Sequence, residues 1–405
     1  NVQGECLIYY SDGENASSPI FVLPYQRTTL DIKMLGVREK VPFSTVIKTD
    51  HRVTATLIHY DKGNALGENF TNIKSTRWGI AEGFVSENTF DYLSLFNPND
   101  YMVEVEIKLH PNPWNQGVIN LRIDGKKRAS LAVNDFIKKE LYPFAYGITM
   151  ESTGAIVASM SRYDNVFGDG MLFMAAPNFG EASGYIAQGS REEGSSEFLD
   201  FLNINDFGIN LSVKIHYIDG ISYITKYYIG HNQWASIKLT EDVITRKDIP
   251  YSLEYEATNA NYWYPNQQAP VIANFIHAYE GNMEGVRFEQ TPHRYWEFAE
   301  GFRESSKKAV VENLYIFNPS ESYSTGNVTI YYDDGINPTV LPFKIAPYGK
   351  LSLLLNEVEK MRDTHSWGAI SYGIRIDSNT GVIPYFVHKD TNMGGSFALN
   401  GTGWD

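Results

Sequence analysis

The stretch Arg77-Trp78-Gly79-Ile80-Ala81-Glu82-Gly83 decides the fold because it recurs along the chain. It is followed ten residues later by Leu93-Ser94-Leu95-Phe96-Asn97-Pro98. Related pairs of segments lie at residues 184–189 with 199–203, and at residues 296–301 with 314–319. Self-similarity at a long, fixed period is characteristic of chains built from repeated units.

Further strand signals recur between these copies. Alternating apolar residues run into an Asp-Gly turn at residues 6–13, 213–220 and 328–335, which predicts β-hairpins. Another expected strand opens at residues 27–32, 128–133, 234–239 and 350–355, with Arg27, Arg128, Trp234 and Lys350 as its first residues.

Each unit ends in an apolar run that closes with an acid. These acids are 103, 116 and 110 residues apart, and they are Asp61, Asp164, Glu280 and Asp390. About seven short strands in about 110 residues predict an antiparallel β-sandwich. We therefore expect an all-β chain of tandem, immunoglobulin-like antiparallel β-sandwich domains.

The repeats predict four domains. Residues 1–74 form an incomplete repeat that lacks its first two strands, and complete repeats follow at residues 75–180, 181–292 and 293–405. Trp404 stands where a further repeat would open. We expect a segment of a longer tandem array, because a sandwich without two strands exposes sheet edges. The alternative is that another chain supplies these strands by β-strand addition.

Composition excludes several classes of partner. The net charge of −14 argues against nucleic acid and anionic membranes, since clustered Lys and Arg hold both. The single cysteine, Cys6, rules out an intrachain disulfide and is expected to be a buried, inert thiol. The sequence contains no run of 18 apolar residues, so we expect no transmembrane helix.

The sequence carries no recognisable catalytic motif, so we expect no enzyme. The nine histidines show no zinc-binding spacing, and His59, His277 and His388 are expected to be polar strand-end residues. The motif acid is Glu82 and Glu300 in two copies but Gln188 in the third, which a catalytic carboxylate would not tolerate. We interpret this position as architectural, either capping a backbone amide or holding Arg162.

Three kinds of ligand site remain as hypotheses. A calcium loop would use carboxylates in acidic turns, namely Asp164, Asp169, Asp333 and Asp334, although Asp-Gly is also the ordinary turn dipeptide. The glycosylation sequons expected in loops are those of Asn15, Asn69 and Asn400. Aromatic residues in polar loops would bind sugars or a partner, or pack on the neighbouring domain, and these are Tyr262, Trp263, Tyr264 and Trp114.

The combination of Trp-x-x-Ala-Glu-Gly, Leu-x-Leu-x-Asn-Pro and a terminal Arg-Tyr-Asp, clearest from Trp78 to Asp164, resembles a repeat domain. That domain occurs in tandem in large secreted and surface-layer proteins of prokaryotes. The resemblance implies a fold and an extracellular location, and it transfers no catalytic residue. Our first hypothesis is a structural cell-surface protein, an S-layer or filament subunit that self-associates. The alternatives are a carbohydrate-binding or adhesin module and an accessory region of a larger surface enzyme.

Overall fold

The computed structural model describes residues 1–405 except 62, 112–116, 167, 240–244, 265, 306–308 and 367. The described residues form antiparallel sheets, and their helical structure is confined to short 3-10 turns. The expected all-β fold is therefore confirmed. In the described part of the chain, no helix is both long and apolar enough to cross a membrane.

Unit 1 contains a three-stranded sheet of order β2-β1-β3 and a separate hairpin of β4 and β5. Cys6 is buried in its core, as expected, and burial raises the pKa of the thiol. The expected strand at residues 27–32 is not formed, since residues 24–31 lie outside the strands. The elements are β1 (Val2–Tyr10), β2 (Asn15–Val22), η1 (Ile32–Leu35), β3 (Phe43–Thr49), β4 (Thr56–Asp61) and β5 (Asn64–Asn69).

Unit 2 is a complete sandwich in which one long strand, β11, belongs to both layers. The first half of β11 pairs with β6 and β8, and its second half pairs with β7 and β12. The elements are β6 (Ser75–Val85), β7 (Thr89–Phe96), β8 (Val103–Pro111), β9 (Gly117–Ile123), β10 (Arg128–Ala132), η2 (Val133–Phe136), η3 (Lys139–Leu141), β11 (Phe144–Asp164), β12 (Asp169–Met174) and β13 (Ala176–Pro177).

Unit 3 repeats this plan with two four-stranded sheets, of order β14-β19-β16-β17 and β18-β15-β20-β21. The long strand is split here into β19 and β20 by the loop at residues 260–271. The elements are β14 (Ser183–Gly189), β15 (Ser196–Asn203), β16 (Ile209–Tyr217), β17 (Ser222–Ile229), β18 (Gln233–Lys238), β19 (Tyr251–Asn259), β20 (Ile272–Tyr279) and β21 (Asn282–Arg287).

Unit 4 again has one long strand, β28, which pairs with β22, β23 and β25 in its first half and with β24 and β29 in its second half. The elements are β22 (His293–Phe298), β23 (Phe302–Glu304), β24 (Val310–Phe317), β25 (Ser324–Tyr332), β26 (Thr339–Ile345), β27 (Lys350–Leu354), η4 (Leu355–Glu357), β28 (Ala369–Asp390), β29 (Ser396–Asn400) and β30 (Thr402–Trp404).

The residues that recur in the sequence form the framework of these units. The indole N–H of Trp78 donates to two backbone carbonyls, and Trp296 makes the same pair of bonds in unit 4. The side-chain amides of Asn97, Asn203 and Asn318 each donate to three backbone carbonyls where the second strand of the unit ends. The repeat therefore reflects buried hydrogen bonds that each complete sandwich must satisfy.

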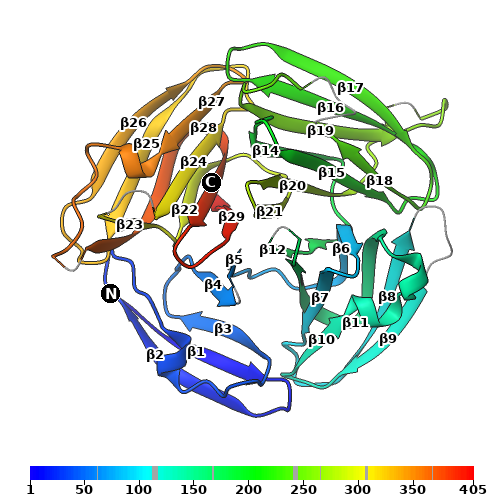
Figure 1. Cartoon of the computed structure of the whole chain (residues 1–405), viewed down its shortest axis with the longest axis horizontal. Helices are drawn as coiled ribbons and strands as arrows, with labels where there is room; N and C mark the ends of the chain where they lie inside the picture. The colour runs from blue at the N-terminus through cyan, green and yellow to red at the C-terminus, as the bar shows by residue number, and fades with distance from the viewer. Residues whose placement is uncertain are drawn as a thin grey trace.

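The four units are arranged as a closed ring, an arrangement that the tandem repeats did not predict (Figure 1). The last hairpin of each unit points to the centre, where β5, β12, β21 and β29 pack together in cyclic order. Trp404 pairs with Tyr295 in β22, as Pro177 pairs with Trp78 in unit 2, so it belongs to unit 4 and is not the counterpart of Trp78 that the sequence suggested. The guanidinium of Arg52 from unit 1 lies 3.5 Å from the centroid of the Trp404 ring, across the closure.

Candidate functional site

The three complete units contain the same buried polar network. In each, the second strand of the opening hairpin places an acid opposite a base on the closing strand, and the register pairs Asp91 with Arg162, for example. A tyrosine and the motif acid or amide complete the set. The networks are Glu82, Asp91, Tyr146 and Arg162 in unit 2; Gln188, Glu197, Tyr251 and His277 in unit 3; and Glu300, Glu312, Tyr372 and His388 in unit 4.

In unit 2 the network centres on the guanidinium of Arg162. It binds Asp91 through two bonds of 2.7 and 2.9 Å and also binds Glu82. The hydroxyl of Tyr146 donates to Asp91 at 2.7 Å. The prediction that Glu82 holds Arg162 is therefore confirmed, and the motif carboxylate neutralises a buried cation.

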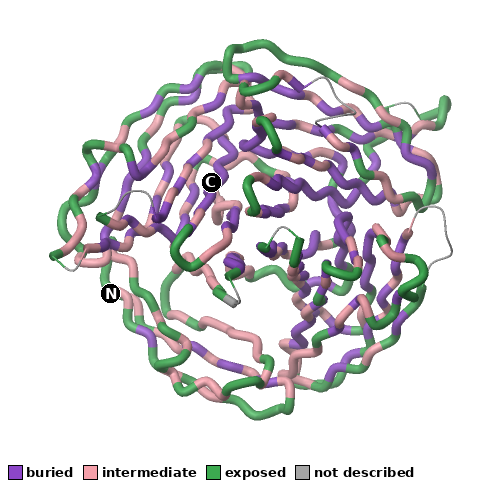
Figure 2. Tube along the Cα trace, in the orientation of Figure 1, coloured by how far each residue is buried: buried purple, intermediate pink, exposed green. Residues whose placement is uncertain are grey.

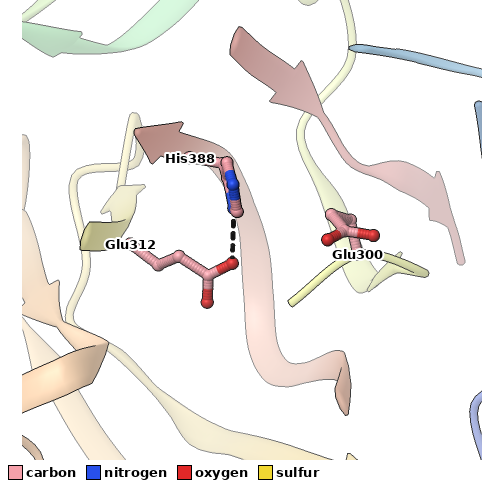
Figure 3. A group of neighbouring side chains, drawn as sticks. All are labelled: Glu300, Glu312 and His388. Carbon is pink, nitrogen blue, oxygen red and sulfur yellow. Dashed lines mark hydrogen bonds and ion pairs between the residues drawn. The ribbon is translucent and has the colours of Figure 1, made fainter. Parts of the chain in front are cut away.

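In unit 4 the imidazole of His388 takes the place of this guanidinium (Figure 3). Its Nδ1 lies 2.8 Å from Glu312 Oε1, and the same carboxylate accepts bonds from Tyr372 and from the backbone N–H of Phe302. Burial disfavours the imidazolium, but the hydrogen bond to Glu312 and the negative charges of Glu312, Glu300 and Asp390 together outweigh it and raise the pKa of His388. Glu300 faces the pair from a neighbouring segment, and burial raises its pKa.

The ligand atoms of Glu300, Glu312 and His388 lie within 4.8 Å of one another, which is the arrangement of a candidate metal centre. The guanidinium of Arg27 already binds Glu300, at 2.5 Å from Oε2. The carboxylate of Glu312 already accepts hydrogen bonds from His388, Tyr372 and a backbone N–H. A divalent ion would have to displace the guanidinium and these donors. The residues fit internal ion pairing better than metal binding.

At each complete unit, a side chain of the next unit in the ring donates hydrogen bonds to backbone carbonyls beside the buried polar network. Lys350 of unit 4 donates to the carbonyl of Tyr251 at 3.1 Å and to Gln188 at 3.4 Å in unit 3. Trp234 of unit 3 donates to the carbonyl of Ala81 in unit 2 at 2.5 Å. Desolvation lowers the pKa of Lys350 to about 7, because the ammonium is buried at the interface.

Arg27 of unit 1 makes the corresponding contact with unit 4 and closes the ring. Its guanidinium donates to the carbonyls of Ala299 at 2.9 Å and Gly301 at 3.1 Å, besides binding Glu300. Sequence reasoning aligned the four residues at this position as strand starts but missed their role. The sequence does contain a signal for this role, because a long side chain with an N–H donor opens the segment in all four copies.

The centre of the ring is organised around Asp169. Its carboxylate accepts bonds from the backbone N–H groups of Gly170 at 2.8 Å, Met283 at 2.9 Å and Ser396 at 2.9 Å, and from that of Ala65. These four donors belong to β12, β21, β29 and β5, so one carboxylate joins all four units. Burial raises the pKa of Asp169, and the four N–H bonds lower it in part.

The acids proposed as calcium ligands lie in two separate turns, and Asp164 is the register partner of Asp169 in the first of them. Asp169 is surrounded by N–H donors, and Asp164 accepts bonds from Thr89 at 2.9 Å and Val166 at 2.8 Å. Asp333 lies 2.9 Å from His365. Asp334 binds Arg362 at 2.7 Å. These carboxylates are engaged by protein donors, so the described structure offers no cluster of free oxygen ligands for calcium.

The three sequons lie at strand ends and not in loops. Asn15 opens β2 and is exposed, whereas Asn69 and Asn400 close β5 and β29. The side-chain amide of Asn69 donates to the carbonyl of Asn400, and that of Asn400 donates to Arg287 at 3.0 Å. Because N-glycosylation uses this amide nitrogen, the structure favours Asn15 among the three.

The aromatic loop of unit 3 is exposed, in agreement with its polar sequence. Tyr262, Trp263 and Tyr264 are 85%, 79% and 60% exposed in the loop between β19 and β20. The rings of Tyr262 and Trp263 pack edge to face, with centroids 5.6 Å apart. They therefore do not pack on the neighbouring domain. Trp114 lies outside the described residues.

Comparisons with known proteins add no assignment. No protein-family model matches the chain, and the comparison with curated proteins found no match. A crystal structure of Thermotoga maritima 1070 covers 26% of this chain and 95% of its own, at 18% identity and a TM-score of 0.24. The Anabaena sensory rhodopsin transducer covers 22% of this chain and 99% of its own, at 22% identity and a TM-score of 0.20. A tetra-tandem repeat of a large adhesion protein covers 100% of this chain and 92% of its own, at 11% identity and a TM-score of 0.13.

Proposed function

We propose that the chain is a non-catalytic structural building block of the cell surface that self-associates. The observation that carries this proposal is the exposed apolar edge of unit 3. β17 is the outer strand of its sheet, and Tyr223, Ile224 and Tyr228 on it are 43%, 58% and 68% exposed. A long, apolar strand edge pairs readily with another strand.

The corresponding outer strands of two other units are protected. β2 contains Pro19 and β26 contains Pro342, and proline lacks the N–H that an added strand needs. β17 has no proline, and Lys226 is its one charged residue. Antiparallel pairing of β17 with β17 of a second copy would extend the sheet across two rings.

The buried polar networks support a non-catalytic role. Their charged groups are buried and form hydrogen bonds and ion pairs with other residues of the chain. The cell-surface location rests on the resemblance of the repeat motifs to those of secreted and surface-layer proteins.

Self-association is tested by measuring the molar mass of the purified chain by light scattering from micromolar to millimolar concentration. We expect the mass to rise with concentration, and Ile224→Lys to hold the chain monomeric. Val118→Lys is the matched control, because Val118 is half-exposed on β9 of unit 2. A chain that stays monomeric throughout, or equal effects of the two substitutions, would refute the proposal.

A second candidate function is carbohydrate binding by the loop at residues 260–271. Exposed aromatic rings stack on the apolar faces of sugars, and Trp263 is 79% exposed in this loop. This candidate does not exclude the first, since a surface building block can also bind glycans.

A further inference from the structure

Unit 1 lacks counterparts of the two strands that open each complete unit. In units 2 and 4 the first half of the long strand pairs with β6 or β22, and its second half with β7 or β24. The corresponding strands of unit 1 are β3 and β4. Among the described residues, β3 pairs only with β1 and β4 only with β5. Two adjacent strand edges of unit 1 are therefore without partners.

The strands β3 and β4 are less buried than their counterparts in the complete units. Seven of the eight residues of β20, the counterpart of β4 in unit 3, are buried. In β4 the residues from Thr56 to Tyr60 are all intermediate or exposed, and no residue of β3 is fully buried. Figure 2 shows the same contrast, since the tube of unit 1 is mostly intermediate or exposed and buried segments are much more frequent in the complete units.

Polar groups beside these edges are also incompletely bonded. Arg128 of unit 2 stands where Lys350 stands in unit 4, and like Lys350 it donates to the carbonyl of the preceding unit, at Phe43. Its Nε is buried without a hydrogen-bond partner among the described residues, as is Oε2 of Glu68. In units 3 and 4 the equivalent cation binds the motif residue, Gln188 or Glu300. The described part of unit 1 has no counterpart of this motif residue, although the charge of Glu68 on β5 acts on Arg128.

His59 lies on β4, the second of the two strands without a partner along one edge. It lies opposite Leu66 on β5, as His388 lies opposite Phe397 on β29, so the two histidines are equivalent. His388 is buried against Glu312 of the opening hairpin, whereas His59 is exposed. A strand added along β4 would therefore meet an imidazole that binds an acid in the complete units.

The missing strands would also continue an interface that exists elsewhere in the ring. β6 of unit 2 packs on β15 and β20 of unit 3, and β14 of unit 3 packs on β24 and β28 of unit 4. A strand at the free edge of β3 would make the same contact with β7 and β11 of unit 2. The added strand would then pair with β3 in the sheet of unit 1 and also pack against unit 2.

We propose that unit 1 is an acceptor for a β-hairpin that the described residues do not contain, which adds one strand to β3 and the other to β4. The partner hairpin carries Glu or Gln in its first strand, facing Arg128, and an acid in its second strand, facing His59. Phe43 stands where the complete units have tyrosine, so the second-strand acid binds His59 without a hydroxyl donor. This acceptor is separate from the β17 edge.

The test uses a synthetic peptide of residues 75–97, which contains β6 and β7, as the probe for the partner hairpin. Its binding to the 405-residue chain is followed by fluorescence anisotropy and by amide hydrogen exchange. We expect one saturable site and slower exchange at residues 43–49 and 56–61. Arg128→Ala in the chain, or Glu82→Ala in the peptide, should weaken binding about tenfold, the size of a lost charged hydrogen bond. Arg122→Ala, an exposed arginine on β9, is the matched control and should leave binding unchanged.

A free hairpin is only marginally stable in water, so a second arm links the same peptide to the chain through a Gly-Ser linker. The linked hairpin should raise Tm by about 3 °C relative to a linked version with Glu82→Lys and Asp91→Lys. Equal Tm values, an absence of saturable binding, or unchanged exchange at β3 and β4 would overturn the proposal. So would a dimer of the chain alone that the peptide dissociates, because the occupant would then be a second copy.

Discussion

The guanidinium of Arg27 lies 2.5 Å from the carboxylate of Glu300, although 273 positions separate the two residues in the chain. The contact joins the first unit to the fourth. Because each unit presents the same position to its neighbour, the interfaces are head-to-tail, and such interfaces form a ring when their rotation closes. Arg27 is therefore the closing member of a repeated contact.

Arg27→Ala should weaken this closure. It leaves the Glu300 carboxylate buried without its cation and frees two backbone carbonyls, so we expect the free energy of unfolding to fall by about 3 kcal/mol. Urea denaturation measures this loss, and amide exchange should become faster at the unit 1 to unit 4 contact.

Arg38→Ala is the matched control for Arg27→Ala. Arg38 belongs to the same unit and pairs with Asp12 and Glu14, but all three side chains are substantially exposed. Its loss should cost much less than the loss of Arg27, because solvent screens exposed ion pairs. Equal effects of the two substitutions would show that Arg27 is an ordinary surface residue and not part of the closure.

Asp169→Asn tests the centre of the ring. The asparagine side chain keeps one acceptor oxygen but turns an N–H₂ group toward backbone N–H donors that the carboxylate now satisfies. We expect a loss of about 3 kcal/mol in the free energy of unfolding, because buried donors are left without acceptors. Exchange should quicken together in β5, β12, β21 and β29. Faster exchange in β12 alone would show that Asp169 serves only its own unit.

The repeat predicted the units well because it records bonds within each unit. Asn97 recurs in all three complete units and Trp78 recurs in unit 4, because they bond the same backbone carbonyls in these sandwiches, and the pair of Glu82 with Arg162 lies within one unit. The replacement of Glu82 by Gln188 correctly pointed to an architectural role. Local and periodic constraints are visible in a single sequence.

Ring closure could not be predicted in the same way. An open array and a ring have the same repeats, and the difference lies in the angle between neighbouring units, which no period encodes. The sequence offers a calcium loop as one hypothesis for Asp169, because an acid in a turn resembles a calcium ligand. Its true partners are backbone N–H groups of four units, and backbone groups carry no sequence signal.

Glu284 gives the ring a specific dependence on pH. It lies on β21 opposite His277, and burial raises its pKa from 4.5 to about 7. A carboxyl whose pKa is higher in the folded state stabilises the fold fully below pH 4.5 and loses this contribution as the pH rises through about 7. The loss amounts to about 3 kcal/mol across this window.

Glu284→Gln removes the titration while keeping the shape of the side chain. The free energy of unfolding of the wild type minus that of the variant should therefore fall between pH 4.5 and 7 and become flat above that window. Chemical denaturation of both proteins in the same buffers at each pH measures this difference. Parallel profiles of the two proteins would contradict the assignment.

Trp263→Ala separates carbohydrate binding from structure. Trp263 is 79% exposed, and its recorded ring contact is with the equally exposed Tyr262, so the substitution should change the free energy of unfolding by less than about 0.5 kcal/mol. If the loop binds sugars, the wild type should bind a subset of a glycan array and Trp263→Ala should lose that subset. Phe136→Ala is the matched control, because Phe136 is half-exposed in η2 of another unit. Retention of the same glycans by Trp263→Ala would exclude the loop as the binding site, and an array with no bound glycan would leave self-association as the function of the ring.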